Sequence, residues 1–174
     1  MSLEKRLAER RDDLVEKWIT RIYGTYPPET QKVWRANKDR FGNPVGCAIT
    51  ETAGALYDHL LAWDDAEAIK ASMERLVRVR AVQDFSPSQA VGFVFVFKKL
   101  LREEFLETLD AEGRLPELLA MEARVDNLAL MAFDLYNSAR EQVFRMRVDE
   151  VKRAQSNLLK RAGMIVDAPA QAAD

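Results

Sequence analysis

The hydrophobic positions of this chain recur mainly every three or four residues, the spacing that marks one face of an α-helix. Residues 90–97 are almost wholly apolar, and apolar positions continue at helical spacing as far as Leu109. Ser86 and Pro87 provide an N-terminal cap and a first helical residue. We therefore predict a helix here. Because a helix that is apolar on all sides must be covered on several of them, it should lie at the centre of the protein.

The same spacing predicts further helices on both sides of this central helix. No β-hairpin signal, βαβ alternation or internal repeat interrupts the pattern. The prediction is an all-α, globin-like bundle of about six helices with a long C-terminal helix. The other helices are expected after Ser2, with Arg10 and Arg11 interrupting the apolar stripe; at Pro28; from Pro44 to about Trp63; behind a cap at Asp64; and after Pro116.

The last predicted helix runs from 116 to 162 without an internal proline or glycine. At 1.5 Å per residue it would be about 65 Å long, so its last turns should protrude, pair with another chain or break. Residues 1–162 are expected to form a single domain, and 163–174 to be a disordered tail. The spacing predicts a dimer seam, after which the apolar stripe moves to Val148, Val151, Gln155 and Leu158. The predicted seam residues are Val125, Leu128, Ala132, Leu135, Ala139, Val143 and Met146.

Composition and charge narrow the classes of protein to consider. Hydrophobic residues make up 48% and charged residues 31%, and the formal net charge of −2 gives no electrostatic case for nucleic acid. Cys47 is the only cysteine, so no intramolecular disulfide can form. No apolar run approaches the roughly 20 residues of a membrane span, and the N-terminus lacks a secretory signal. The expected compartment is the cytoplasm.

The sequence contains no recognisable catalytic or metal-binding constellation. His59 is the only histidine, which cannot form a typical metal site alone, although a haem would need only one. The acidic pairs sit among basic residues and indicate solvated helix faces. We therefore expect no enzyme activity, no metal and no cofactor.

Aromatic and aliphatic side chains around the central helix could line a pocket for a small apolar ligand. An apolar cavity against that helix would support this hypothesis, and a fully packed core would argue against it. The candidate pocket residues are Phe93, Val94, Phe97, Phe41, Trp63 and His59.

Two segments and the long last helix together resemble a known family. Residues 38–46 read Lys-Asp-Arg-Phe-Gly-Asn-Pro-Val-Gly, and residues 79–92 contain Asp-Phe-Ser-Pro-Ser-Gln. The chain resembles, over about residues 3–160, the N-terminal domain of the RsbR/RsbRD-type co-antagonists of bacterial stress signalling. The resemblance implies an all-α, globin-like sensory domain that dimerises and usually binds no haem. It offers no agreed catalytic or ligand residues.

In that family the final helix leads into a STAS domain that carries the phosphorylation sites and joins the stressosome, whereas this sequence stops after the helix. The expected function is thus a non-enzymatic cytoplasmic sensor, homodimeric through its terminal helix and without a STAS output of its own. Two alternatives remain. One is a haem- or small-ligand-binding globin that uses His59, and the other is an adaptor that docks on a separate protein.

Overall fold

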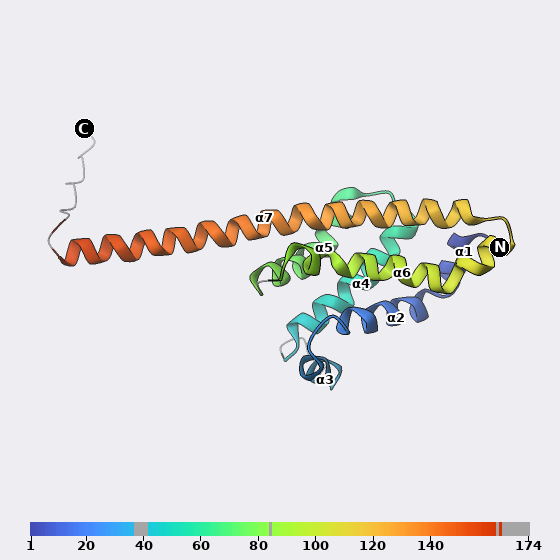
Figure 1. The fold of residues 1–174 in the computed structure, drawn as a ribbon, viewed down its shortest axis with the longest axis horizontal. Coiled ribbons are helices and arrows are strands. Elements are labelled where there is room, and N and C mark those ends of the chain that lie inside the picture. Colours follow the sequence, from blue (N-terminus) through green and yellow to red (C-terminus); the bar gives the residue numbers. More distant parts are fainter. Residues whose placement is uncertain (37–41, 84, 163, 165–174) are drawn as a thin grey trace. The chain divides into compact units, whose positions relative to one another are not determined.

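The computed structural model describes residues 1–36, 42–83, 85–162 and 164, and these residues form seven helices and no strand (Figure 1). The predicted all-α fold with a long C-terminal helix is confirmed. The helices are α1 (Leu3–Glu9), α2 (Arg11–Tyr23), α3 (Pro28–Ala36), α4 (Pro44–Ala62), α5 (Ala66–Val82), α6 (Pro87–Ala111) and α7 (Leu115–Arg161). None of the helices in the described part of the chain is long and apolar enough to cross a membrane.

The chain divides into two compact units, Met1–Ala139 and Arg140–Asp174. The first unit contains α1 to α6, the start of α7 and the hydrophobic core. In the second unit the described residues are helical as far as Arg161, and most of their side chains are exposed. The expected single domain over 1–162 stays a prediction, and the predicted tail lies outside the described residues except for Met164.

The N-terminal helix predicted as one element is two helices. Arg10 joins α1 to α2 with φ −106° and ψ 19°, which is not helical geometry. The interruption of the apolar stripe at Arg10 and Arg11 marks this joint. Ser2 caps α1 by accepting a hydrogen bond from the backbone of Lys5 at 3.3 Å.

The predicted starts of α4 and α6 are confirmed, and that of α5 is shifted by one residue. Ser86 and Gln89 form a capping box, in which each side chain accepts a hydrogen bond from the other's backbone N–H. The cap of α5 is Asp65, not Asp64, and its carboxylate accepts hydrogen bonds from two backbone N–H groups at 3.0 Å. The turn between α6 and α7 passes through Gly113, whose φ of 68° suits a residue without a Cβ atom.

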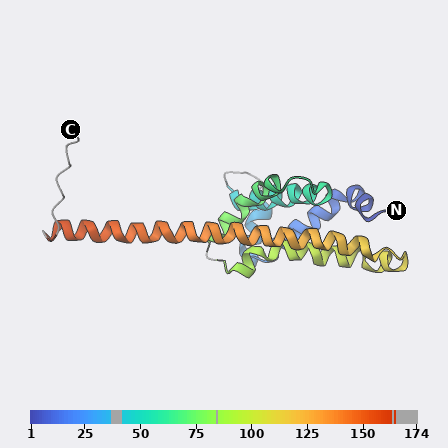
Figure 2. The ribbon, with the colours of Figure 1, turned by 90° about the horizontal axis from the view of Figure 1, so that it is seen from above.

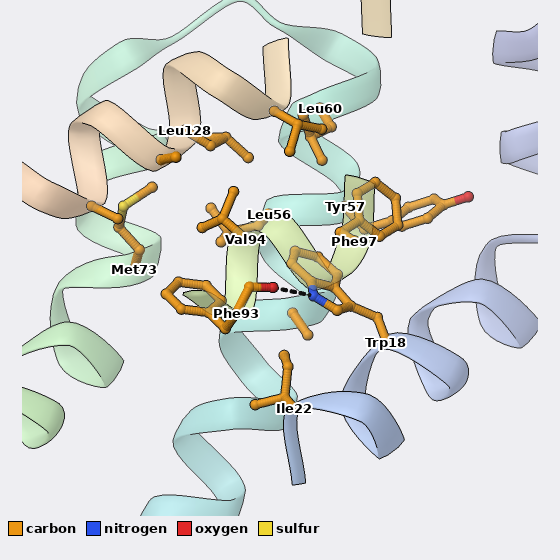
Figure 3. Close-up of a cluster of buried hydrophobic side chains, with 14 of the residues drawn as sticks. Trp18, Ile22, Leu56, Tyr57, Leu60, Met73, Phe93, Val94, Phe97 and Leu128 are labelled. Atoms are coloured by element: carbon orange, nitrogen blue, oxygen red, sulfur yellow. Dashed lines mark hydrogen bonds between the residues drawn. The ribbon is translucent and has the colours of Figure 1, made fainter. Parts of the chain in front are cut away.

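α6 contributes buried residues from Ala90 to Leu109 to the core of the first unit, but one side of this helix is open, because Phe95 is 49% exposed. α6 packs against α2 and α5, and the start of α7 lies alongside it (Figures 1 and 2). Trp18 of α2 donates a hydrogen bond from its indole nitrogen to the Phe93 carbonyl at 2.8 Å (Figure 3). The Trp18 and Tyr57 rings also contact Phe97, with centroids 4.5 and 5.6 Å away. These aromatic contacts connect α6 to both α2 and α4.

Candidate functional site

A fully buried arginine, Arg80, is the most unusual group in the first unit. It lies near the end of α5, and none of its surface is exposed. Its guanidinium carbon lies 5.1 to 5.4 Å from the ring centroids of Tyr26, Phe85 and Phe93, at distances typical of cation–π contacts. Three aromatic rings from three parts of the chain thus surround one positive charge.

One nitrogen of Arg80 has no hydrogen-bond partner among the described residues. Nε donates to the Tyr26 hydroxyl at 3.0 Å, and Nη1 donates to the carbonyls of Gln89 and Ala90 at 3.1 and 3.2 Å. Nη2 is the one buried side-chain nitrogen or oxygen among the described residues that has no hydrogen-bond partner. No carboxylate in the described part of the chain pairs with this charge. Burial lowers the pKa of Arg80 and raises that of Tyr26.

Arg80 is connected to α7 through Phe85. The Phe85 ring faces the guanidinium, and the Phe85 carbonyl accepts a hydrogen bond from the Tyr136 hydroxyl of α7. A change in the position of Arg80 would therefore alter its contact with Phe85, and Phe85 in turn contacts Tyr136. This arrangement can transmit a shift in packing but contains no nucleophile and base. Within the described residues, no group of three or more His, Cys, Asp or Glu side chains could hold a metal ion.

Arg80 was not singled out in the sequence analysis. The available signal was the charge itself, because a basic residue at a core position must be neutralised, solvated or surrounded by polarisable groups. Its contact with Tyr26 could not be foreseen, since the two residues are 54 positions apart in the sequence.

The structure places the predicted pocket residues in different parts of the fold. Phe93, Val94 and Phe97 are fully buried in the core (Figure 3). Trp63 ends α4 with a left-handed φ of 48°, and His59 Nε2 lies 3.1 Å from the Ser72 hydroxyl. Phe41 lies outside the described residues. A shared ligand pocket, or a haem on His59, stays a prediction.

An open hollow of about 560 Å³ lies on the outer surface of α6 and the start of α7. Its largest apolar members are considerably exposed: Leu130 at 65%, Phe95 at 49% and Phe133 at 43%. Leu130 and Phe133 belong to α7, and Phe95 lies on a different side of α6 from the buried Phe93 and Phe97. The hollow is lined by Pro87, Ser88, Val91, Phe95, Asp126, Ala129, Leu130 and Phe133.

Most of the predicted dimer seam is part of the chain's own core. Val125, Leu128, Ala132 and Ala139 are buried, Leu135 and Val143 are half-buried, and only Met146 is exposed. The same spacing serves a helix that packs on its own domain and one that packs on a second copy. The four buried residues therefore pack within one chain, and pairing through the other three stays a prediction.

Ion pairs between charged side chains connect α7 to α6. Glu122 of α7 is 5% exposed, and its two carboxylate oxygens accept hydrogen bonds from Arg102 at 2.5 and 2.7 Å. Lys98 lies 2.9 Å from Asp126, one turn further along α7. The Arg102 guanidinium lowers the pKa of Glu122.

The fold and the Arg80 site together define an all-α domain in which a buried polar side chain, Arg80, takes part in helix packing. The sequence model of the RsbT co-antagonist protein rsbRD N-terminal domain matches residues 12–151, and the chain belongs to this family. The family is one of regulatory signalling domains and not a known enzyme family. No curated protein and no solved structure matches the chain.

The predicted resemblance is therefore confirmed. The segments that carry it have structural roles. Asn43 caps α4, Ser86 caps α6, and Phe85 and Gln89 contact Arg80.

Proposed function

We propose that this chain is a non-enzymatic cytoplasmic sensor domain of bacterial stress signalling that acts through contacts with other proteins. The family match over residues 12–151 is the observation that carries this proposal. The described residues support it because their distinctive features are a buried cation and an exposed apolar hollow. Both are suited to changes in packing and to protein contact.

The domain acts as a homodimer through the outer surface of α6 and α7. Phe95, Leu130 and Phe133 present an apolar surface from two adjacent helices, and large exposed apolar groups that gather in this way mark interaction sites. A second copy is the proposed occupant, since a two-fold interface lets Phe133 of each copy enter the hollow of the other. Aromatic side chains of this kind are enriched at interface centres.

A signal reaches this surface through Arg80. Its guanidinium contacts the first turn of α6 through Gln89 and Ala90, and its aromatic neighbour Phe85 accepts a hydrogen bond from Tyr136 of α7. A ligand or partner that moves α5 would change these contacts together. Nη2, which has no hydrogen-bond partner in the described part of the chain, supports this role, because an incompletely satisfied buried group weakens the arrangement that holds it.

The test of the dimer is sedimentation velocity over a range of protein concentrations. We expect reversible dimerisation, and Phe133→Glu should weaken it by at least about tenfold, or ~1.4 kcal/mol, by placing a charge in the hollow. Leu119→Glu is the matched control, because Leu119 is 61% exposed on α7 and does not line the hollow. A parent protein that stays monomeric at every concentration would remove the dimer, and equal effects of both variants would remove the assigned surface.

A further inference from the structure

The α7 segment of the second unit has its own apolar seam, which the proposed dimer does not use. Phe144, Val148, Val151, Gln155 and Leu158 follow one another at intervals of four, three, four and three residues. This is the spacing of the a and d positions in a coiled coil, with Phe144, Val151 and Leu158 at d. These three side chains are 67%, 56% and 65% exposed. We call these five residues the C-terminal seam.

Most of the positions that flank the C-terminal seam are basic. With Val148 at an a position, the e positions are Arg145, Lys152 and Leu159, and the g positions are Arg147, Ala154 and Arg161. No acidic residue occupies an e or g position in residues 144–161, all of which the structure describes. Glu141, which precedes the seam, pairs with Arg145 at 2.5 Å. Residues 140–161 contain seven basic and three acidic residues, a formal +4 in a chain of −2.

This charge pattern disfavours a second copy of the chain as the occupant. In a parallel pair, a g residue faces the e residue of the partner's next heptad, so Arg147 would face Lys152. In an antiparallel pair, e faces e and g faces g, which again opposes basic residues. Like charges at these positions oppose association, whereas acidic residues there would be attracted.

The shape of the seam favours a protein helix over a membrane surface. Apart from Met146 and Leu159, its large exposed apolar residues form a narrow a and d stripe with Gln155 within it, whereas helices that lie on a membrane have a broad apolar face. Asp149 and Glu150 next to Val151 would also be repelled by anionic lipid. A single polar residue at an a position is a known means of fixing the register of a helix pair.

We infer that the C-terminal seam binds an amphipathic helix of a different protein that carries apolar a and d residues and acidic e and g residues. This inference goes beyond the proposed dimer, since its residues lie outside the hollow. An experiment can therefore contradict the proposed dimer without contradicting this inference, and the reverse also holds.

The experiment measures binding of the full chain to two synthetic helical peptides by fluorescence anisotropy. Both peptides have leucine at a and d; one has glutamate at e and g, and the other has lysine. We expect the glutamate peptide to bind at least about tenfold more tightly, and its affinity to fall as salt rises. Equal affinity, preference for the lysine peptide, or no binding of either would overturn the inference.

Three variants assign the effect to the seam. Val151→Asp should abolish binding, and Arg147→Glu with Lys152→Glu should reverse the preference toward the lysine peptide. Arg153→Glu is the control, since it changes charge at an outward f position and should keep the preference. Circular dichroism checks that each variant keeps its helix, and a reversal equally large in Arg153→Glu would overturn the assignment.

Two further measurements separate the other occupants. Sedimentation with phosphatidylglycerol vesicles tests the membrane, and sedimentation velocity of Val151→Asp tests the second copy. Binding to vesicles with no preference between the peptides, or loss of dimers in Val151→Asp, would overturn the inference. We expect no binding to the vesicles and no loss of dimers in Val151→Asp.

Discussion

At the scale of single residues, Arg80 is a charge that the core holds without a described carboxylate. Its fit depends on aromatic faces and on two carbonyls of the first turn of α6. Those carbonyls lie within a helix and keep their intrahelical N–H partners if Arg80 is replaced. The volume of the side chain should therefore matter more to stability than its charge.

We expect Arg80→Met to change the free energy of unfolding by no more than about 1 kcal/mol, because an apolar side chain of similar length needs no desolvation of a charge. Arg80→Ala should lower it by about 3 kcal/mol, because a cavity remains among Tyr26, Phe85 and Phe93. Urea unfolding of both variants measures the difference. A loss in Arg80→Met as large as that in Arg80→Ala would show that the hydrogen bonds, and not the filled volume, stabilise this region.

Glu122 gives the fold a dependence on pH. Arg102 lowers its pKa in the folded protein from the ordinary value of 4.5. Its contribution is therefore fully present above that value and is lost as the pH falls through the lower, folded-state pKa. Glu122→Gln should reduce the free energy of unfolding by about 1–2 kcal/mol at neutral pH, and by much less in acid, where the parent carboxylate is protonated too.

Urea unfolding of Glu122→Gln and the parent at a series of pH values measures this convergence. Glu107→Gln serves as the control, since Glu107 is exposed on α6 and should show a small effect at every pH. A constant difference between parent and Glu122→Gln across the series would mean that the ion pair does not cause it.

At the scale of elements, the start of α4 depends on the close fit of two residues. The Asn43 side chain accepts a hydrogen bond from the Gly46 backbone at 2.9 Å. A Cβ atom on residue 46 would lie 2.3 to 2.7 Å from atoms of that side chain. Gly46 is thus required because the cap occupies the space in which its side chain would stand.

Gly46→Ala should lower the free energy of unfolding by about 2 kcal/mol, and Asn43→Ala by about 1 kcal/mol. The double variant should lose less than the sum, because removing the Asn43 amide removes the steric conflict. Gly92→Ala is the control: nothing lies within 4 Å of its added Cβ, so it should stabilise α6 by about 0.5–1 kcal/mol. Additive losses would mean that the two residues act independently.

The elements also show which features could be predicted from sequence and why. The starts at Asn43–Pro44 and Ser86–Pro87 were foreseen because capping is a local interaction between residues three apart. What covers the apolar stripe from Val125 to Ala139 could not be foreseen, because spacing alone does not distinguish the protein's own core from a second copy. The contact between Arg80 and Tyr26 was missed because the two residues are 54 positions apart in the sequence.

At the scale of the whole molecule, charge is distributed unevenly along the chain. Residues 140–161 have a formal charge of +4, so the remaining residues together have −6. The net value of −2 therefore hides a basic segment. The net charge alone therefore does not indicate an acidic partner. The proposed functions follow this division, with an apolar contact in the first unit and an electrostatically selected one in the second.

Residues 140–161 are helical although most of their side chains are exposed. Most of the stability of a helix in a folded protein comes from packing of its apolar side, which is largely absent in this segment. Its amide protons should therefore exchange with solvent by local opening, well before the core of the first unit unfolds. Any partner that covers Phe144 and Val151 must slow that exchange, so the segment itself reports whether it is occupied.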